Sequence, residues 1–317
     1  MRCILLCSLV LLISVVRGAL AQIPLDNVES HVLAPLTKIS KVVNEVDLAF
    51  TVTDKKGRFI SNLQPSDFAL LDNNAAPGRL TFFQQRSDLP LHLAILIDAS
   101  DSVKFRFKFE QKAAFSFVKK IMRARTDEVF VVTFNDQVKT VQELTEKKEK
   151  ISKALKTTNA RGDTALYDAI IYASEKLRQV PEHQLTRRGI VLLSDGVDTV
   201  HRSTLEQAKD AAARAGVMVF SVSTTLLHDD SNEAGDRTLK DLAESTGGMF
   251  LSGGDEDKIR DAFHDVERAL RHQYVVAYNP NSFSADGSYH TVEVVPRKHG
   301  LRANCRKGYY AIVRAFH

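Results

Sequence analysis

Two carboxylates and three hydroxyls occupy positions in this sequence from which they could hold a metal ion together. Asp98, Ser100 and Ser102 follow the apolar run "LHLAILI", and Asp195 follows "GIVLLS". Thr164 stands just before a run with helical spacing. Oxygen ligands of this kind suit Mg²⁺, with Mn²⁺ or Ca²⁺ as competitors. Because only two of the five groups are charged, waters or a carboxylate from another molecule must complete the coordination shell.

These five residues need a scaffold that brings three distant loops together. Between residues 91 and 272, segments of helical periodicity alternate with the apolar runs "LHLAILI", "EVFVVTF", "GIVLLS", "VMVFSVS" and the short "GMFLS". Near-continuous apolar runs are typical of parallel strands that are buried on both faces. The alternation predicts a doubly wound, mostly parallel open α/β sheet of the Rossmann-like class. Since ligands bind beyond the carboxyl ends of such strands, we expect the three polar loops at one edge.

Three segments between the runs predict helices. In "ALYDAIIYASEKL" apolar residues recur three or four positions apart, as on a helix that packs against a sheet. "STLEQAKDAAARAG" opens with Ser203 as a capping residue and closes with Gly216. "VKFRFKFEQKAAFSFVKKIM" alternates at first and gains helical spacing from Phe107, and we interpret it as a crossover helix that the topology requires. The alternative for this segment, a basic and aromatic surface for nucleic acid or membrane, is disfavoured by the near-zero net charge.

The segments on both sides of this α/β region have a different sequence pattern. Residues 36–90 and 273–317 contain short runs rich in Val, Phe, Thr and Leu between Gly, Pro and Asn clusters, which is typical of antiparallel strands. Neither flank alone offers many strands, and both join the central region directly. We predict that they combine into one β-sandwich beside an α/β domain of residues 91–272.

The polar constellation resembles a known pattern. Asp98-x-Ser100-x-Ser102, then Thr164, then Asp195 after a later strand, is similar to the metal-ion-dependent adhesion site (MIDAS) of the von Willebrand factor A-type (VWA) domain. The resemblance covers the whole α/β region. It implies that the three hydroxyls bind Mg²⁺, that the two aspartates act directly or through water, and that an Asp or Glu of a protein partner takes the open position.

Two further acidic residues are accessory candidates at this site. Asp101 stands where the family usually has a Gly between the two serines. Asp tolerates the left-handed backbone of a tight turn, and the added carboxylate would alter metal preference or repel an acidic partner. Asp198, in "SDGVDT", is either a second acidic ligand or a turn residue that caps the following segment.

The flanks resemble secreted bacterial proteins described only as VWA-related, which implies a fold but no characterised activity.

The N-terminus has the features of a secretory signal. A basic start, an apolar run from Ile4 to Val16 and a small-residue ending predict cleavage between Ala21 and Gln22. An uncleaved anchor is the alternative, although this run is shorter than the roughly 20 residues that a spanning helix needs. No later stretch approaches that length. We therefore expect a secreted, periplasmic or cell-envelope protein without a transmembrane segment after cleavage.

Composition and charge narrow the classes of partner. With 44% hydrophobic and 26% charged residues the chain is of the globular type, so a large core is expected. Removing residues 1–21 lowers the formal net charge from +4 to +2, which leaves no electrostatic case for a nucleic acid partner. It also removes Cys3 and Cys7, so Cys305 has no partner for an intramolecular disulfide. Its strand-like surroundings favour a packed thiol over a link between two chains.

These patterns favour a binding protein over an enzyme. A hydrolase with Ser100 or Ser102 as the nucleophile needs a histidine base, and the sequence has no glycine-flanked nucleophile elbow. We interpret "RGD" at residues 161–163 as part of the loop that presents Thr164, not as an adhesion peptide. We expect an exported adhesion-type module that captures an acidic residue of a protein partner. The alternative is a structural cell-envelope protein whose metal site is stabilising or vestigial and whose β-sandwich makes the contacts.

Overall fold

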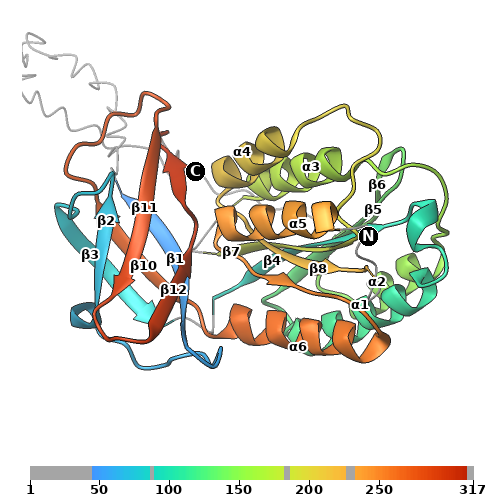
Figure 1. Cartoon of the computed structure of the whole chain (residues 1–317), viewed down its shortest axis with the longest axis horizontal. Helices are drawn as coiled ribbons and strands as arrows, with labels where there is room; N and C mark the ends of the chain where they lie inside the picture. Colours follow the sequence, from blue (N-terminus) through green and yellow to red (C-terminus); the bar gives the residue numbers. More distant parts are fainter. Residues whose placement is uncertain (1–44, 86–88, 182–185, 226–232, 313–317) are drawn as a thin grey trace, which may run out of the picture. The chain divides into compact units, whose positions relative to one another are not determined.

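The computed structural model describes residues 45–85, 89–181, 186–225 and 233–312 (Figure 1). The predicted signal peptide and the first residues of the N-terminal β-rich segment, 36–44, lie outside these ranges. Within the described ranges, no helix is long and apolar enough to cross a membrane.

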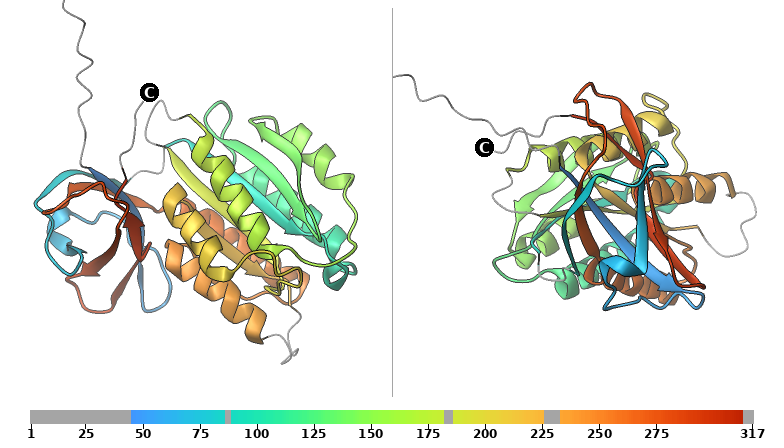
Figure 2. Two further views of the ribbon diagram at one scale, coloured as in Figure 1. Left: turned by 90° about the horizontal axis from the view of Figure 1, so that it is seen from above. Right: turned by 90° about the vertical axis from the view of Figure 1, so that its left-hand side faces the viewer.

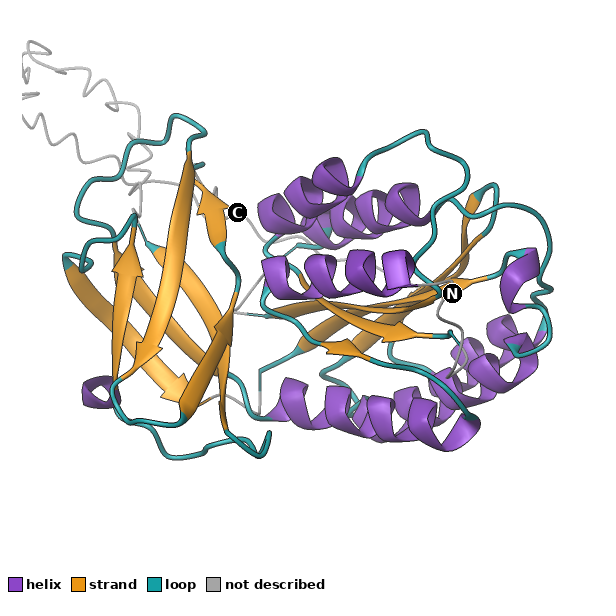
Figure 3. Ribbon diagram, viewed as in Figure 1, coloured by secondary structure: helices purple, strands orange, loops and turns teal. Residues whose placement is uncertain are grey.

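A six-stranded sheet forms the centre of the α/β region (Figures 1 and 3). Neighbouring strands are parallel except for the pair β5 and β6, which is antiparallel. The strands in spatial order are β6 (Val138–Thr145), β5 (Glu128–Phe134), β4 (Leu91–Asp98), β7 (Arg187–Ser194), β8 (Met218–Ser223) and β9 (Phe250–Leu251). The predicted fold class, a doubly wound and mostly parallel sheet, is confirmed.

Helices cover both faces of this sheet. Alternate side chains of the buried strands point to opposite faces, so both faces are apolar and each packs against helices. Leu93, Ile95 and Ile97 of β4 pack in one apolar cluster, and Ala94 and Leu96 pack in the other. The first face is covered by α1 (Phe107–Ile121), α2 (Lys148–Lys156) and α6 (Glu256–Arg271), and the second by α3 (Leu166–Gln179), α4 (Leu205–Ala215) and α5 (Glu233–Thr246). Every residue of β4 is buried, which explains its unbroken apolar sequence.

Three local features differ from the sequence-based expectation. The antiparallel edge strand β6 was not expected, because its side chains are mostly half-buried or exposed and include Lys139 and Glu143. The strand expected at "GMFLS" consists of only the two residues of β9. Thr204, not Ser203, is the N-cap of α4: its hydroxyl accepts a hydrogen bond from the Gln207 amide at 3.3 Å. The Ser203 hydroxyl donates instead to Asp168, which leaves the cap to the next hydroxyl along the chain.

Two antiparallel sheets contain strands from both ends of the described chain. One has the order β12-β1-β10-β3 and the other β13-β11-β2. Figure 2 shows blue N-terminal strands beside red C-terminal strands in these sheets. A 3₁₀ turn, η1 (Pro65–Asp67), precedes β2. The strands are β1 (Val46–Asp54), β2 (Phe68–Asp72), β3 (Arg79–Gln85), β10 (Tyr274–Asn279), β11 (Tyr289–Pro296), β12 (Leu301–Cys305) and β13 (Gly308–Tyr310).

The two antiparallel sheets share one apolar core and one buried polar cluster. Phe50 and Tyr274 from one sheet pack in the same cluster as Phe68 from the other. At its centre Asp72, on β2, accepts hydrogen bonds from the hydroxyls of Tyr278 and Tyr309, each at 2.8 Å. Because Tyr278 belongs to β10, this carboxylate ties the two sheets together.

Cys305 is a free thiol at the end of β12. Burial raises the pKa of its thiol to about 11, and a hydrogen bond from the Val294 amide only partly offsets this effect. A thiol with such a pKa is almost entirely protonated at neutral pH and therefore poorly nucleophilic. This environment fits a packed cysteine.

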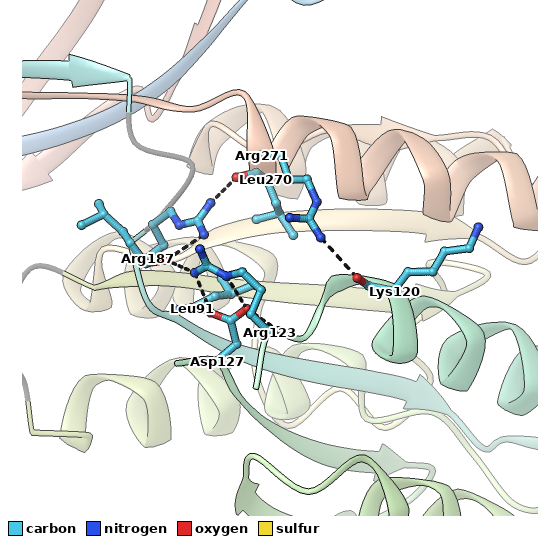
Figure 4. A network of polar contacts seen from close by, with 8 residues as sticks. Leu91, Lys120, Arg123, Asp127, Arg187, Leu270 and Arg271 are labelled. Carbon is cyan, nitrogen blue, oxygen red and sulfur yellow. Dashed lines mark hydrogen bonds and ion pairs between the residues drawn. The ribbon is translucent and has the colours of Figure 1, made fainter. Parts of the chain in front are cut away.

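A buried ionic network fixes the ends of the sheet remote from the polar loops (Figure 4). The Asp127 carboxylate accepts hydrogen bonds from the Leu91 amide at 3.1 Å and from the Arg123 side chain at 2.9 and 3.0 Å. Arg123 also donates to the carbonyl of Leu89 at 2.6 Å. Arg187 donates to the same carbonyl and to that of Leu270. The network thus joins the start of β4 to the ends of α1 and α6.

Candidate metal-binding site

Asp98 is the last residue of β4 and is fully buried. Its Oδ1 accepts a hydrogen bond from the Ser100 amide at 3.0 Å, and its Oδ2 accepts one from the Ser194 hydroxyl at 2.8 Å. Ser194 ends the neighbouring parallel strand β7. The carboxylate is therefore held from two strands at the carboxyl edge of the sheet, where ligands bind in this class of fold.

Three more of the predicted residues are linked to one another by hydrogen bonds. The hydroxyls of Ser100 and Ser102 lie 3.0 Å apart, and the Ser102 hydroxyl donates to Asp195 Oδ2 at 2.7 Å. The Val197 amide donates to the other oxygen of Asp195 at 3.1 Å. Hydroxyls and carboxylates from the loops after β4 and β7 thus meet at one place.

The loop that carries Thr164 is fastened to both of the other loops. The Asp101 amide donates to the Gly162 carbonyl at 3.0 Å, which joins it to the loop after β4. The Thr164 amide donates to the Thr199 hydroxyl at 2.8 Å, which joins it to the loop after β7. Thr164 is buried, and within the described parts of the chain no hydrogen bond of its side-chain hydroxyl is found. That oxygen is available for a ligand.

Two glycines allow the loops of the site to pack closely against neighbouring segments, namely α5 and the turn after β5. Gly162 and Gly196 have left-handed backbone, with φ of 84° and 82°. A Cβ on Gly196 would meet the Gly235 carbonyl oxygen at 2.2 Å, and one on Gly162 would meet Asp136 Oδ1 at 2.6 Å. The glycine of the "RGD" tripeptide therefore has a structural role in the Thr164 loop.

The electrostatics of the site fit a hard cation. Burial, and then the nearby charge of Asp195, raise the pKa of Asp98 to about 7 despite the hydrogen bonds from Ser100 and Ser194. A divalent ion between two such carboxylates would offset their repulsion. Over the described residues, no three His, Cys, Asp or Glu side chains gather into a metal-binding group. An ion at this place would therefore need hydroxyl oxygens as well, a donor set that suits Mg²⁺ or Mn²⁺ better than a soft metal.

The two accessory candidates lie in different surroundings. Asp101 is exposed and begins a 3₁₀ turn, η2 (Asp101–Val103), without left-handed backbone, so the tolerance of Asp for that conformation is not needed. Asp198 is buried and accepts hydrogen bonds from the amides of Tyr167 at 3.2 Å and His201 at 2.8 Å. Asp198 therefore caps the first turn of α3, and it also caps the turn that leads from Asp198 itself to His201.

Two residues beside the site were not expected from the sequence. Ser194 orients Asp98, and only its position at the end of "GIVLLS" next to Asp195 hinted at a role. Glu110, in the first turn of α1, is fully buried and feels the charges of both Asp98 and Asp195. The sequence "VKFRFKFE" alternates polar and apolar residues, so a charged residue at its end is expected to be exposed to solvent. The burial of Glu110 could therefore not be recognised from the sequence.

Comparison with known proteins identifies one family. The sequence model of the von Willebrand factor type A domain family matches residues 92–265 of this chain. No curated protein matches the chain.

Solved structures with a similar fold come from several sources. A point mutant of the PilB minor pilin from Streptococcus sanguinis is 14% identical with a TM-score of 0.49, over 58% of this chain and 62% of the pilin. A von Willebrand factor type A protein from Catenulispora acidiphila is 12% identical with a TM-score of 0.49, over 78% of this chain and 74% of that one. Proximal thread matrix protein 1 from the mussel byssus, with zinc in its MIDAS motif, is 19% identical with a TM-score of 0.49, over 63% of this chain and 50% of that one. The chain thus spans less than two thirds of the pilin and half of the mussel protein.

Proposed function

Because the chain belongs to the von Willebrand factor type A domain family, we propose that it is an exported binding module that presents Mg²⁺ to an acidic side chain of a protein partner. Domains of this family are protein-interaction modules, are generally not enzymes, and commonly bind a divalent metal at the MIDAS. The finer assignments, namely the metal, the five ligand residues and the acidic partner, are our proposal. Mn²⁺ or Ca²⁺ would be accepted by the same oxygens.

The observation that carries the proposal is the continuous polar chain from Asp98 through Ser100 and Ser102 to Asp195. Consecutive groups in this chain are 2.7 to 3.0 Å apart or joined through the Ser100 amide. The loop of Thr164 is hydrogen-bonded to the loops on both sides. A structural role alone does not require three loops to converge with hydroxyls and carboxylates on one edge.

Each residue has a distinct role in this proposal. Ser100, Ser102 and Thr164 offer hydroxyl oxygens directly, while Asp98 and Asp195 balance the charge of the ion directly or through water. When bound, the ion supplies a Lewis-acidic position that a partner carboxylate can complete. Asp101, which is exposed next to Ser100, places a negative charge at the rim and disfavours partners with several acidic residues.

Apolar side chains near the site complete a surface for a protein partner. Phe105, three residues after Ser102, is 100% exposed, and Val197, two residues after Asp195, is 39% exposed. Aromatic and aliphatic groups around a polar anchor are typical of the contacts that contribute most to protein binding. The favoured partner segment therefore carries one carboxylate flanked by apolar residues.

A displayed library of peptides with single Asp or Glu residues tests this function. We expect wild-type protein to select such peptides in Mg²⁺, and to lose them in EDTA or with Ser100→Ala, which removes a ligand oxygen but no charge. Asp257→Ala, an exposed acidic residue of α6, is the control and should bind normally. Partner binding that persists in EDTA and maps to residues 36–90 would instead favour the structural cell-envelope alternative.

Export is a separate part of the proposal and rests on the N-terminal sequence. N-terminal sequencing of protein recovered outside the cytoplasm should begin at Gln22. Recovery of the chain only in the cytoplasm, with residues 1–21 intact, would contradict export without affecting the metal site. We also propose that the α/β domain comprises residues 91–272 and that 36–90 and 273–317 form the sandwich.

A further inference from the structure

A buried carboxylate in the first turn of α1 has no visible neutralising contact. Glu110 has no exposed surface, and neither of its carboxylate oxygens has a hydrogen-bond partner in the part of the chain that the structure describes. Leaving a carboxylate buried without donors costs several kcal/mol if it is charged. Such a group in a native protein requires an explanation, and a bound water or ion is a common one.

The nearest basic side chain does not supply that explanation. Arg106, one helical turn before Glu110, lies on the same face of the helix. No ion pair joins the two among the described residues, and one guanidinium nitrogen of Arg106 is itself buried without a hydrogen bond. The Arg106 charge is felt at Glu110 but does not engage its oxygens.

The position of Glu110 on α1 places it close to the loop that carries the candidate metal ligands. Side chains on a helix lean toward its N-terminus, over the preceding turn. The turn before α1 is η2, which follows Asp98 and Ser100 directly. Burial, partly offset by the charge of Arg106 and assisted by the charges of Asp98 and Asp195, raises the pKa of Glu110 to about 8. The carboxylate is thus close enough to both aspartates to interact with their charge.

Resting on the function proposed above, we propose that Glu110 is a positioning residue that supports the metal site from the protein interior without contacting the ion. Its oxygens accept hydrogen bonds from water molecules in the shell of the ion. A bound divalent cation favours the ionised form of Glu110, and the carboxylate charge then adds to those of Asp98 and Asp195, which raises affinity for a divalent over a monovalent cation. A carboxylate that only filled space in the core would do neither.

Titration calorimetry with Mg²⁺ and Mn²⁺ at pH 7.5 tests this role on the full mature chain. We expect Glu110→Gln, which keeps the shape and removes the charge, to weaken binding by about 10- to 100-fold, the usual effect of removing a group that supports metal ligands. Glu110→Met is a second neutral variant of similar volume. Both should fold, because replacing a buried carboxyl group without hydrogen-bond partners by a neutral side chain of similar volume is tolerated. Glu244→Gln, an exposed residue of α5, should leave the dissociation constant unchanged.

The outcomes separate this inference from the proposed function. If Asp195→Ala abolishes binding while both Glu110 variants stay within twofold of wild type, the role of Glu110 is overturned and the metal site stands. If wild-type protein binds neither ion, the metal site and the role of Glu110 both fail. A weakened affinity in both Glu110 variants, with unchanged circular dichroism, supports the inference.

Discussion

Mg²⁺ is expected to raise the melting temperature of residues 22–317 by several degrees, and Ser100→Ala and Asp195→Ala are expected to lose most of that rise. Binding at 100 times the dissociation constant stabilises a folded protein by about 2.7 kcal/mol. For a chain of this size, each kcal/mol corresponds to roughly 2–4 °C. Thermal unfolding in EDTA, Mg²⁺, Mn²⁺ and Ca²⁺ measures the effect and ranks the ions.

The metal-dependent rise in melting temperature has its physical reason in the repulsion between carboxylates when the site holds no ion. Burial and the charge of Asp195 both disfavour ionised Asp98. Asp195→Ala removes that repulsion, at the cost of the hydrogen bond from Ser102. In EDTA this variant should therefore match wild-type stability to within about 1 kcal/mol, the net worth of one hydrogen bond. The loss of stability should appear only when metal is added.

Asp198→Ala is the matched control for this experiment. Its carboxylate caps the first turn of α3 and accepts from the amides of Tyr167 and His201. The variant should lower the baseline by about 0.5–2 kcal/mol, as other lost caps do, and keep the metal-dependent rise. No rise with any ion in wild type, or an equal rise in Ser100→Ala, would contradict the proposed ligand set.

Strands could be predicted from the sequence where both of their faces are buried. β4 and β7 read as unbroken apolar runs because helices cover each side of the sheet. β6 could not be recognised in the same way, since an edge strand needs few apolar residues and its partner β5 supplies the pairing. Pairing across the chain, such as β1 with β10, follows from tertiary contacts that leave only a weak pattern in the sequence.

The candidate site could be proposed from the sequence because the types of its residues and their places at strand ends are both local features. Their supporting groups could not. Ser194 matters because β7 lies beside β4, and Glu110 stands out because the first turn of α1 buries it. The shift of the α4 cap from Ser203 to Thr204 has a similar cause, since Asp168 on α3 engages the first hydroxyl. The roles of Ser194 and of the α4 cap both depend on a neighbour distant in sequence.

Asp127→Ala is expected to destabilise the protein by about 3–5 kcal/mol, the range for removing one partner of a buried ion pair. Asp127 is 1% exposed and holds the Arg123 side chain through both carboxylate oxygens. Its loss also leaves the buried amide of Leu91, the first residue of β4, without this acceptor. Urea unfolding monitored by circular dichroism measures the change, and the melting temperature should fall by roughly 6–20 °C.

The ion pair of Lys240 and Glu244 provides the matched control. It has the same i,i+4 spacing, but its side chains are 59% and 52% exposed and its atoms lie 3.8 Å apart. Glu244→Ala should change stability by no more than about 0.5 kcal/mol, since exposed pairs contribute little. In the double variant Arg123→Ala/Asp127→Ala, the unpaired Arg123 charge is gone, so its destabilisation should be smaller than the sum of the two single changes. Equal, small effects at Asp127 and Glu244 would mean that the network of Figure 4 does not secure the start of β4.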